Sequence, residues 1–276
     1  MKRQRTVQAL LLNGGMLVLA LLFLLPIVWM IVAATKANHQ ILSVPPSLAP
    51  GSSLAANWRD LNSDLPFLRN VFNSVAIASI FTLFATLISA MGGYAFAKFS
   101  FRGRAALFLV VVAALTIPFE VRAIPQYLLI ARDLRLANTW IAVILPWLAY
   151  PLGIFFMRQN MLSVPTELLE AARIDGAGEA RIFLQVVLPI MRPALAAVAI
   201  VVFLFQWNDF FWPLLILTQK QAYTIPVALG TLVGLTRVSW GGIMVGTAIA
   251  TVPFLVLFLF LQRYFVAGIT AGAVKD

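Results

Sequence analysis

Long apolar stretches without a charged residue constrain this chain more than any other feature. Four stretches carry no charge: Thr6–Thr35, Asn70–Ala97, Leu136–Met157 and Val238–Gln262. Two more, Ala105–Ala131 and Pro193–Gln219, are equally apolar but hold a few embedded charges. A helix needs ~20 apolar residues to cross the hydrocarbon core of a bilayer. The pattern therefore predicts six transmembrane helices.

Composition supports a membrane protein. The chain is 62% hydrophobic and only 11% charged, whereas a soluble domain is roughly half apolar and a quarter charged. We expect an all-α polytopic membrane protein with a single transmembrane domain, residues 1–276. The expected spans lie near residues 9–35, 70–97, 105–131, 136–158, 193–218 and 240–263. The first could instead be a cleaved signal peptide, but its apolar core is long for that role, which favours a retained anchor.

The scarcity of reactive side chains excludes several classes of site. The chain has no cysteine, so disulfides, thiolate metal sites and cysteine nucleophiles are excluded. His39 is the single histidine and cannot form a HExxH zinc site. The net charge of +10 could indicate nucleic acid, but in so apolar a chain membrane lipid with anionic headgroups is the expected partner. We expect no nucleic-acid binding.

The distribution of basic residues predicts the orientation. With the amino terminus in the cytoplasm, twelve of the 20 lysine and arginine residues fall on the cytoplasmic side and eight on the other. This bias follows the positive-inside rule. We expect a multi-pass protein with both termini cytoplasmic, an external loop over residues 36–69 and a cytoplasmic loop over residues 159–192.

The cytoplasmic loop contains the charged stretch "EAARIDGAGEARIFLQVVLPI", Glu170–Ile190. Pro165 suits the first turn of a helix, and Gly176 with Gly178 interrupts the run. The segment therefore reads as helix, turn, helix. Such a segment could dock a partner or could be a plain connecting loop, and its pattern alone leaves both open.

The stretch resembles the EAA loop of binding-protein-dependent ABC transport permeases. Glu170, Ala171, Ala172 and Gly176 match its first half, and Leu188 with Pro189 falls at the family's distance. Val186 stands where isoleucine is usual, a conservative departure. Further pieces resemble the carbohydrate-uptake branch, specifically the second permease subunit of maltose-type importers: "NSVAIAS", "YAFAKFSFRGR", "IPFEVRAIPQYLLI", "NTWIAVILP", "GIFFMRQNMLSVPTELLEAARIDGAG", "LPIMRPAL", "WNDFFWPL" and "VAGITAGAVKD".

The resemblance implies the type I permease fold of ABC importers, with a cytoplasmic coupling helix over Leu168–Gly176. It implies transport of a carbohydrate or related polyol across the bacterial inner membrane by alternating access. The implied partners are a second permease subunit in a heterodimer, a dimer of ATP-binding subunits and an extracytoplasmic substrate-binding protein. The chain has no GxxxxGK[ST] phosphate loop. ATP and Mg are therefore expected on the partner ATPase, with no cofactor and no enzymatic activity in this subunit. The implied coupling residues are Glu170, Ala171, Ala172, Asp175 and Gly176.

Three alternatives remain open. The importer could carry a glycerol phosphate, for which Arg122 would suit an anionic substrate. An ion-coupled secondary transporter would more often show paired inverted repeats or broken helices at the midplane. An intramembrane enzyme would need a catalytic constellation, but Glu120 and Asp209 are the only acids expected within the membrane and no histidine accompanies them.

Charges near the external ends of the spans mark a candidate substrate pathway. "WNDFFWPL" places Asp209 among aromatic rings, and an ionisable residue within a span is a functional candidate. The candidates are Trp207, Asn208, Asp209 and Arg122, and the alternative is an interfacial aromatic belt. Arg122 and Asp209 would share a depth on straight helices, so we predict an ion pair between them. The simpler alternative pairs Arg122 with Glu120.

The last residues, 266–276, are polar and rich in glycine. We expect them not to continue the sixth helix. They would either fray or, as the resemblance implies, form a tail that reaches the ATPase through Gly272 and Lys275.

Overall fold

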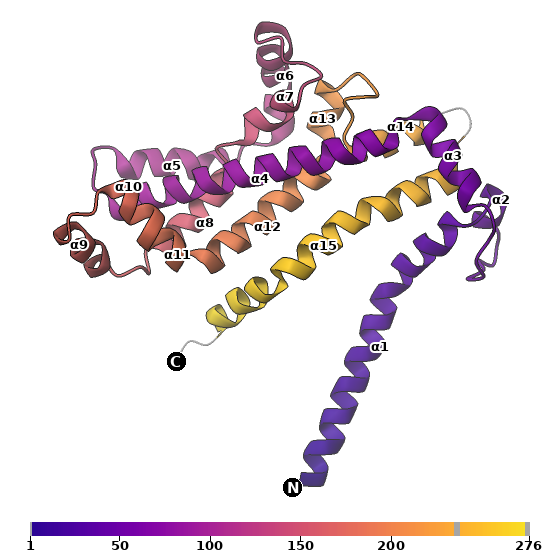
Figure 1. The fold of residues 1–276 in the computed structure, drawn as a ribbon, viewed down its shortest axis with the longest axis horizontal. Coiled ribbons are helices and arrows are strands. Elements are labelled where there is room, and N and C mark those ends of the chain that lie inside the picture. The colour runs from indigo at the N-terminus through magenta and orange to yellow at the C-terminus, as the bar shows by residue number, and fades with distance from the viewer. Residues whose placement is uncertain (1, 235–237, 274–276) are drawn as a thin grey trace. The chain divides into compact units, whose positions relative to one another are not determined.

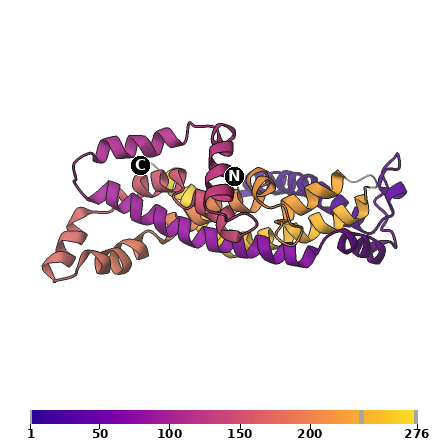
Figure 2. The same cartoon turned by 90° about the horizontal axis from the view of Figure 1, so that it is seen from above.

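A computed structural model describes residues 2–234 and 238–273, and every regular element in these ranges is helical. The chain divides into two compact units. The first unit contains Met1–Phe67 and Ala228–Val252, and the second contains Leu68–Val227 and Pro253–Asp276. Figures 1 and 2 show the ribbon in two views.

The first unit begins with the long helix α1, Lys2–Ala34, followed by α2, Asn38–Ile41, and α3, Leu54–Asp64. Buried Asn57 joins α3 to the end of α1, because its amide nitrogen donates to the carbonyls of Ala34 and Lys36, both at 2.8 Å. Gly241 lies against this amide so closely that a Cβ would stand 2.2 Å from Asn57 Oδ1. The charged Lys36 is buried, its ammonium 4.9 Å from the Trp29 ring centroid.

The second unit holds most of the helices. After α4, Phe67–Lys98, its elements are α5, Arg104–Ala114; α6, Phe119–Tyr127; the π-helical η1, Leu128–Asp133; α7, Trp140–Ile144; the 3-10 turn η2, Leu145–Trp147; α8, Pro151–Met161; α9, Thr166–Ile174; α10, Glu179–Ile182; the π-helical η3, Phe183–Val187; α11, Leu188–Ile190; α12, Arg192–Asn208; and α13, Phe211–Ile216. The chain then continues through α14, Ile225–Val233, into α15, Trp240–Ala273.

Proline interrupts several of the apolar segments. The axis bends by 96° between α5 and α6, by 46° between η2 and α8, and by 82° between α11 and α12. Pro118, Pro151 and Pro193 stand at the start of the second helix of each pair. Proline cannot donate the backbone hydrogen bond that would continue the preceding helix.

Within the described residues, two helices are long and apolar enough to cross a membrane, Leu10–Ala34 and Phe67–Lys98. The number rises to five if each bent pair forms one span. The first part of α15, Trp240–Val256, counts as a shorter apolar helix. The six predicted spans therefore remain a prediction. The third, 105–131, the fourth, 136–158, and the fifth, 193–218, are not continuous helices, because they break after Ala114, after Trp147 and after Asn208.

A glycine of α4 allows close packing against α8. A Cβ on Gly93 would lie 2.6 Å from Met157 Cβ and 2.7 Å from the Arg158 backbone nitrogen. The two backbones therefore approach as closely as glycine permits. The core of the second unit extends from here to α9, whose Leu169 is fully buried.

Amide side chains fix the loop over residues 218–225. Asn70 and Asn73 of α4 donate to three carbonyls of the loop at 2.8 to 3.1 Å, and Ser74 Oγ accepts from the Ile225 amide. Asn138 Oδ1 accepts from two further loop amides at 2.7 and 2.9 Å. Side chains from α4 and from just before α7 thus hold the loop through hydrogen bonds.

The expectation that residues from 266 onward leave the sixth helix is wrong, because α15 continues through Ala273. Glycine inside a helix costs only about 1 kcal/mol relative to alanine, and no proline follows Pro253. The segment can therefore remain helical despite Gly268 and Gly272. Lys275 lies outside the described residues.

Candidate functional site

Helix α9, Thr166–Ile174, contains the EAA residues and begins where the sequence predicts a helix start. Pro165 precedes it, Glu167 lies in its first turn and Arg173 in its last, which suits the positive and negative ends of the helix dipole. Leu169 anchors its inner side in the core. The helix expected over Leu168–Gly176 begins two residues earlier, at Thr166, and ends before the glycine, at Ile174.

A left-handed glycine ends α9. Gly176 has φ of +80°, its amide donates to the Arg173 carbonyl at 3.0 Å, and the Ala177 amide donates to the Ala172 carbonyl at 2.9 Å. These two bonds form a Schellman motif, which satisfies carbonyls that have no partner inside the helix. Ala172 and Ala177 both pack against the core. The predicted glycine turn is therefore present, and its backbone conformation is one that glycine adopts without strain.

The outer face of α9 is exposed and has helical spacing. Glu167, Glu170, Ala171 and Ile174 stand at positions i, i+3, i+4 and i+7, and all four are exposed. Ile174 is 86% exposed, an unusual state for a large apolar side chain. Asp175 is also exposed at the end of the helix. Ile174 was missed as a candidate site residue, although its spacing from Glu170 and Ala171 places it on their face.

Two polar contacts join the ends of α9 to the end of α4. Before α9, the Lys98 ammonium donates to the Val164 carbonyl at 2.5 Å. After it, Arg173 Nε donates to Glu179 Oε1 at 2.7 Å, and the Tyr94 hydroxyl donates to Glu179 Oε2 at 3.1 Å. The hydrogen bond from Arg173, and then that from Tyr94, holds the pKa of the Glu179 carboxyl below its ordinary value.

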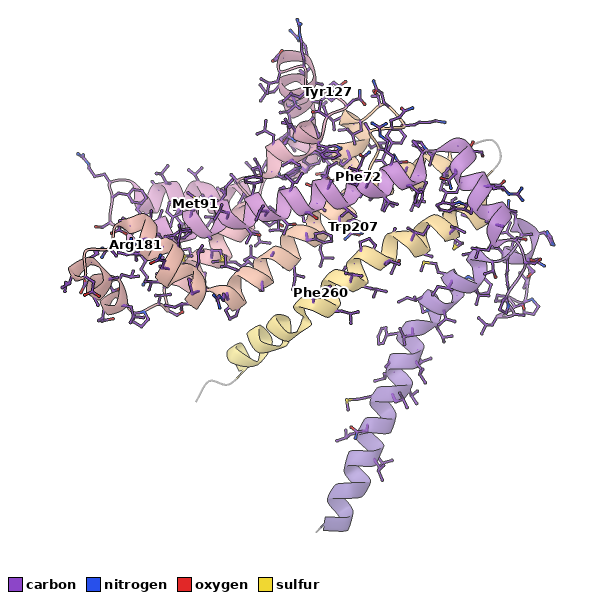
Figure 3. All side chains as sticks on the ribbon, viewed as in Figure 1. Phe72, Met91, Tyr127, Arg181, Trp207 and Phe260 are labelled. Atoms are coloured by element: carbon purple, nitrogen blue, oxygen red, sulfur yellow. The ribbon has the colours of Figure 1, made fainter. Side chains whose placement is uncertain are left out.

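The candidate pathway residues lie elsewhere in the second unit. Figure 3 shows Trp207 on α12 and also Tyr127 on α6, the helix that contains Arg122. Both lie well away from Arg181 of α10, the helix that follows α9. Trp207 is buried and stacks on Phe203, with ring centroids 5.5 Å apart. Asn208 is exposed and donates to the Leu204 carbonyl at 2.8 Å.

Asp209 marks the break between α12 and α13. Its Oδ1 accepts from the Trp212 amide at 3.4 Å, and the Trp212 indole donates to the Ala142 carbonyl at 2.9 Å. Asp209 thus accepts a hydrogen bond from the first turn of the short helix α13, and the Trp212 indole joins that helix to α7. The aromatic residues of "WNDFFWPL" therefore include both packing residues and exposed rings, Phe210 and Phe211.

The predicted ion pair between Arg122 and Asp209 is wrong, and Arg122 forms no ion pair with Glu120 either. Among the described residues, ion pairs join Arg132 to Asp133 and Arg173 to Glu179. The Arg122 guanidinium instead lies over the Trp147 ring, 4.5 Å from its centroid. The prediction assumed a straight third span, whereas the 96° bend before Phe119 redirects the chain that carries Arg122.

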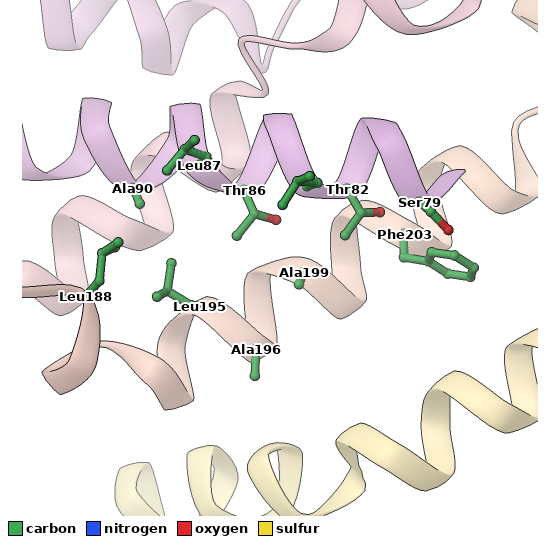
Figure 4. A pocket seen from close by; sticks show the side chains of 11 residues that line it. Ser79, Thr82, Thr86, Leu87, Ala90, Leu188, Leu195, Ala196, Ala199 and Phe203 are labelled. Atoms are coloured by element: carbon green, nitrogen blue, oxygen red, sulfur yellow. The ribbon is translucent and has the colours of Figure 1, made fainter. Parts of the chain in front are cut away.

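A groove between α4 and α12 was not predicted (Figure 4). It has a volume of about 530 Å³ and is almost entirely apolar. Thr82 and Thr86 of α4 line it together with Ala199 and Phe203 of α12. The hydroxyls of both threonines are buried without a hydrogen-bond partner in the described residues. No cluster of three or more histidine, aspartate or glutamate side chains that could hold a metal occurs in residues 2–234 and 238–273.

Comparison with known proteins identifies the family. Residues 83–271 match the family described as the binding-protein-dependent transport system inner membrane component. The arabinooligosaccharides transport system permease protein AraQ of Halalkalibacterium halodurans is 44% identical over 203 residues, which cover 74% of this chain and 72% of the relative. The sn-glycerol-3-phosphate transport system permease protein UgpE of Pectobacterium atrosepticum is 34% identical over 91% of this chain and 92% of its own.

A solved structure supports the fold. The crystal structure of a bacterial ABC transporter that imports the acidic polysaccharide alginate contains a chain that matches 95% of this one, and 98% of that chain is covered. The TM-score is 0.72 at 20% sequence identity. The family predicted from the EAA loop is confirmed, and so is the predicted all-helical fold. This chain belongs to the family of inner membrane components of binding-protein-dependent transport systems, the permease subunits of ABC importers.

Proposed function

We propose that this permease is one half of a heterodimer that moves a carbohydrate or a related polyol inward across the bacterial membrane. Separate ATPase subunits bind ATP and Mg and supply the energy, and an extracytoplasmic binding protein delivers the substrate. The observation that carries the proposal is the exposed outer face of α9, with the 86% exposed Ile174 beside Glu170. This exposed apolar side chain lies beside charged residues on a helix that matches the EAA loop, and the combination supports docking to a protein partner.

Five residues within α9 or directly after it have a mechanical part in this proposal. Glu170 offers a carboxylate to a basic group in a cleft of the ATPase, and Ala171 permits close approach. Ile174 fills an apolar pocket there, while Asp175 and Gly176 form the turn that ends the rod. Closure of the ATPase dimer on ATP then displaces α9, and the permease opens alternately to the two sides.

This arrangement requires α9 and both termini on the cytoplasmic side, which the distribution of basic residues favours. The tail is proposed to reach the ATPase with Gly272 and Lys275. The helical state of the chain up to Ala273 is compatible with a stiff rod rather than a frayed end.

The substrate class has two candidates. A neutral carbohydrate suits the exposed aromatic rings Phe210 and Phe211, because aromatic faces combine flat apolar area with a polar edge. A polyol phosphate is favoured by one observation, the guanidinium of Arg122, which forms no ion pair in the described residues. We propose the pathway through Trp207, Asn208, Asp209 and Arg122 for either class. Buried Trp207 would contribute by packing, and exposed Asn208 by contact.

Site-specific cross-linking tests the docking face. The chain contains no cysteine, so Ile174→Cys can carry a photo-reactive label in the assembled transporter. We expect the label to capture the ATPase subunit, whereas the same label at the exposed control Asp133→Cys should not. Equal capture by the two positions, or none from Ile174→Cys, would contradict the docking role.

A further inference from the structure

Helix α9 lies between two turns, which raises the question of how its movement could reach the membrane helices. Residues 162–165 separate it from α8, and residues 175–178 separate it from α10. Leu169 packs the inner side of α9 into the core, but the two ends of the helix meet the rest of the chain through these turns. Transmission requires direct contacts between α9 and an element that enters the membrane.

The side chain of Glu179 makes such a contact. Its two carboxylate oxygens accept from different elements, Oε1 from Arg173 on α9 and Oε2 from Tyr94 on α4. Tyr94 and Glu179 are far apart in sequence, with a separation of 85 positions. One carboxylate at the start of α10 therefore joins the end of α9 to the long helix α4.

Tyr94 is well placed to receive a displacement. It is only 6% exposed, and its ring packs against Phe99 and Phe183 with centroids 5.2 and 5.4 Å away. One helical turn further along α4, the ammonium of Lys98 holds the Val164 carbonyl just before α9. The same end of α4 therefore contacts the chain on both sides of α9, and the contact through Glu179 involves the side nearer Gly176.

We propose that Glu179 is a positioning residue for energy coupling, whose carboxylate fastens the end of α9 to Tyr94 so that displacement of α9 moves α4. This inference rests on the proposed function, in which a partner ATPase displaces α9. Glu179 itself lies on α10, outside the exposed face of α9 that would meet the ATPase. Its role is to transmit the movement, and its loss should leave docking intact.

The test compares substrate imported per ATP hydrolysed in proteoliposomes that contain the complete transporter and its binding protein. We expect Glu179→Ala to lower this ratio roughly 2- to 30-fold, the range that mutations along a coupling network produce, while the ATPase still co-purifies. Tyr94→Phe removes one hydroxyl and should lower the ratio in the same direction. The exchange Arg173→Glu with Glu179→Arg should restore much of the loss, which a general packing defect would not allow.

Asp133→Ala is the matched control, because it removes an ion pair away from α9, an exposed contact of 3.6 Å with Arg132. Its ratio should equal that of the unmodified protein. An unchanged ratio in both Glu179→Ala and Tyr94→Phe would overturn the inference while leaving ATP-driven import in place. Import that needs no ATP in the unmodified transporter would instead overturn the proposed function.

Discussion

Replacing Gly176 by alanine isolates the conformational requirement at the end of α9. A Cβ built at this position has no atom within 4 Å, so alanine introduces no clash. The cost comes from the φ of +80°, which an L-residue with a Cβ adopts at a cost of about 1 kcal/mol. That energy corresponds to roughly a fivefold change in the equilibrium between two states of the turn. In the closed state the Ala177 amide donates to the Ala172 carbonyl, and in the open state this hydrogen bond is broken.

Hydrogen exchange of the Ala177 amide measures that equilibrium, because this amide donates to Ala172 only while the turn is closed. We expect roughly fivefold faster exchange in Gly176→Ala, from the cost of about 1 kcal/mol. Gly176→Pro should open the turn further, because proline can neither adopt this φ nor donate to Arg173.

Two other glycines serve as controls. Gly178 has a φ of −72° and open space around it, so Gly178→Ala should leave both exchange and import unchanged. Gly103 shares a φ of +83° and open space, so Gly103→Ala should cost similar local stability without affecting α9. Equal exchange of Ala177 in Gly176→Ala and in Gly178→Ala would refute the reasoning.

Three further results are expected. Asn57→Ala should lower the free energy of unfolding by about 1 to 3 kcal/mol, because two buried carbonyls at the end of α1 lose their donor; an unchanged thermal midpoint in detergent would contradict this. Gly93→Val should cost about 1 to 3 kcal/mol through overpacking against Met157, seen as a lower yield of folded protein, whereas retention of the full yield would show that the helices can separate. The pKa of Glu179 is lowered in the folded chain. The stabilisation of the fold by its carboxylate is therefore fully present above the ordinary carboxyl pKa, and it is lost only as the pH falls through the lowered pKa of the folded state. The difference in import ratio between the unmodified transporter and Glu179→Gln should therefore stay constant from about pH 5 to pH 8, and a difference that disappears within that range would count against this assignment.

The sequence predicted helix α9 and the turn that ends it well, because the signals for both are local. Pro165, the acidic first turn and Gly176 all act within a few residues, and the structure shows the corresponding helix start and turn. The face that contains Ile174 follows from the same spacing. The contact of Glu179 with Tyr94 could not be predicted in this way, since no local pattern relates two residues on separate helices.

The third predicted span shows what the sequence alone could not predict. A continuous rise of ~1.5 Å per residue placed Arg122 at the depth of Asp209, but the chain bends by 96° before Phe119. Pro118 was a visible signal for a break, although its presence does not reveal the size of the bend. The tail beyond residue 265 was misjudged because glycine lowers helix stability without ending a helix that has no other interruption.

ATP-dependent import by the Glu170→Lys variant tests the central claim most directly. The assay reconstitutes the permease pair with its ATPase and binding protein in proteoliposomes and follows entry of labelled substrate. Reversing the charge on the exposed face of α9 should abolish import while the protein remains folded in the membrane. Removing one partner of a buried interfacial charge pair costs about 2 to 5 kcal/mol. Asp133→Lys, which reverses an exposed charge away from α9, should import normally. Undiminished ATP-driven import by Glu170→Lys would contradict the claim that this helix receives the energy for transport.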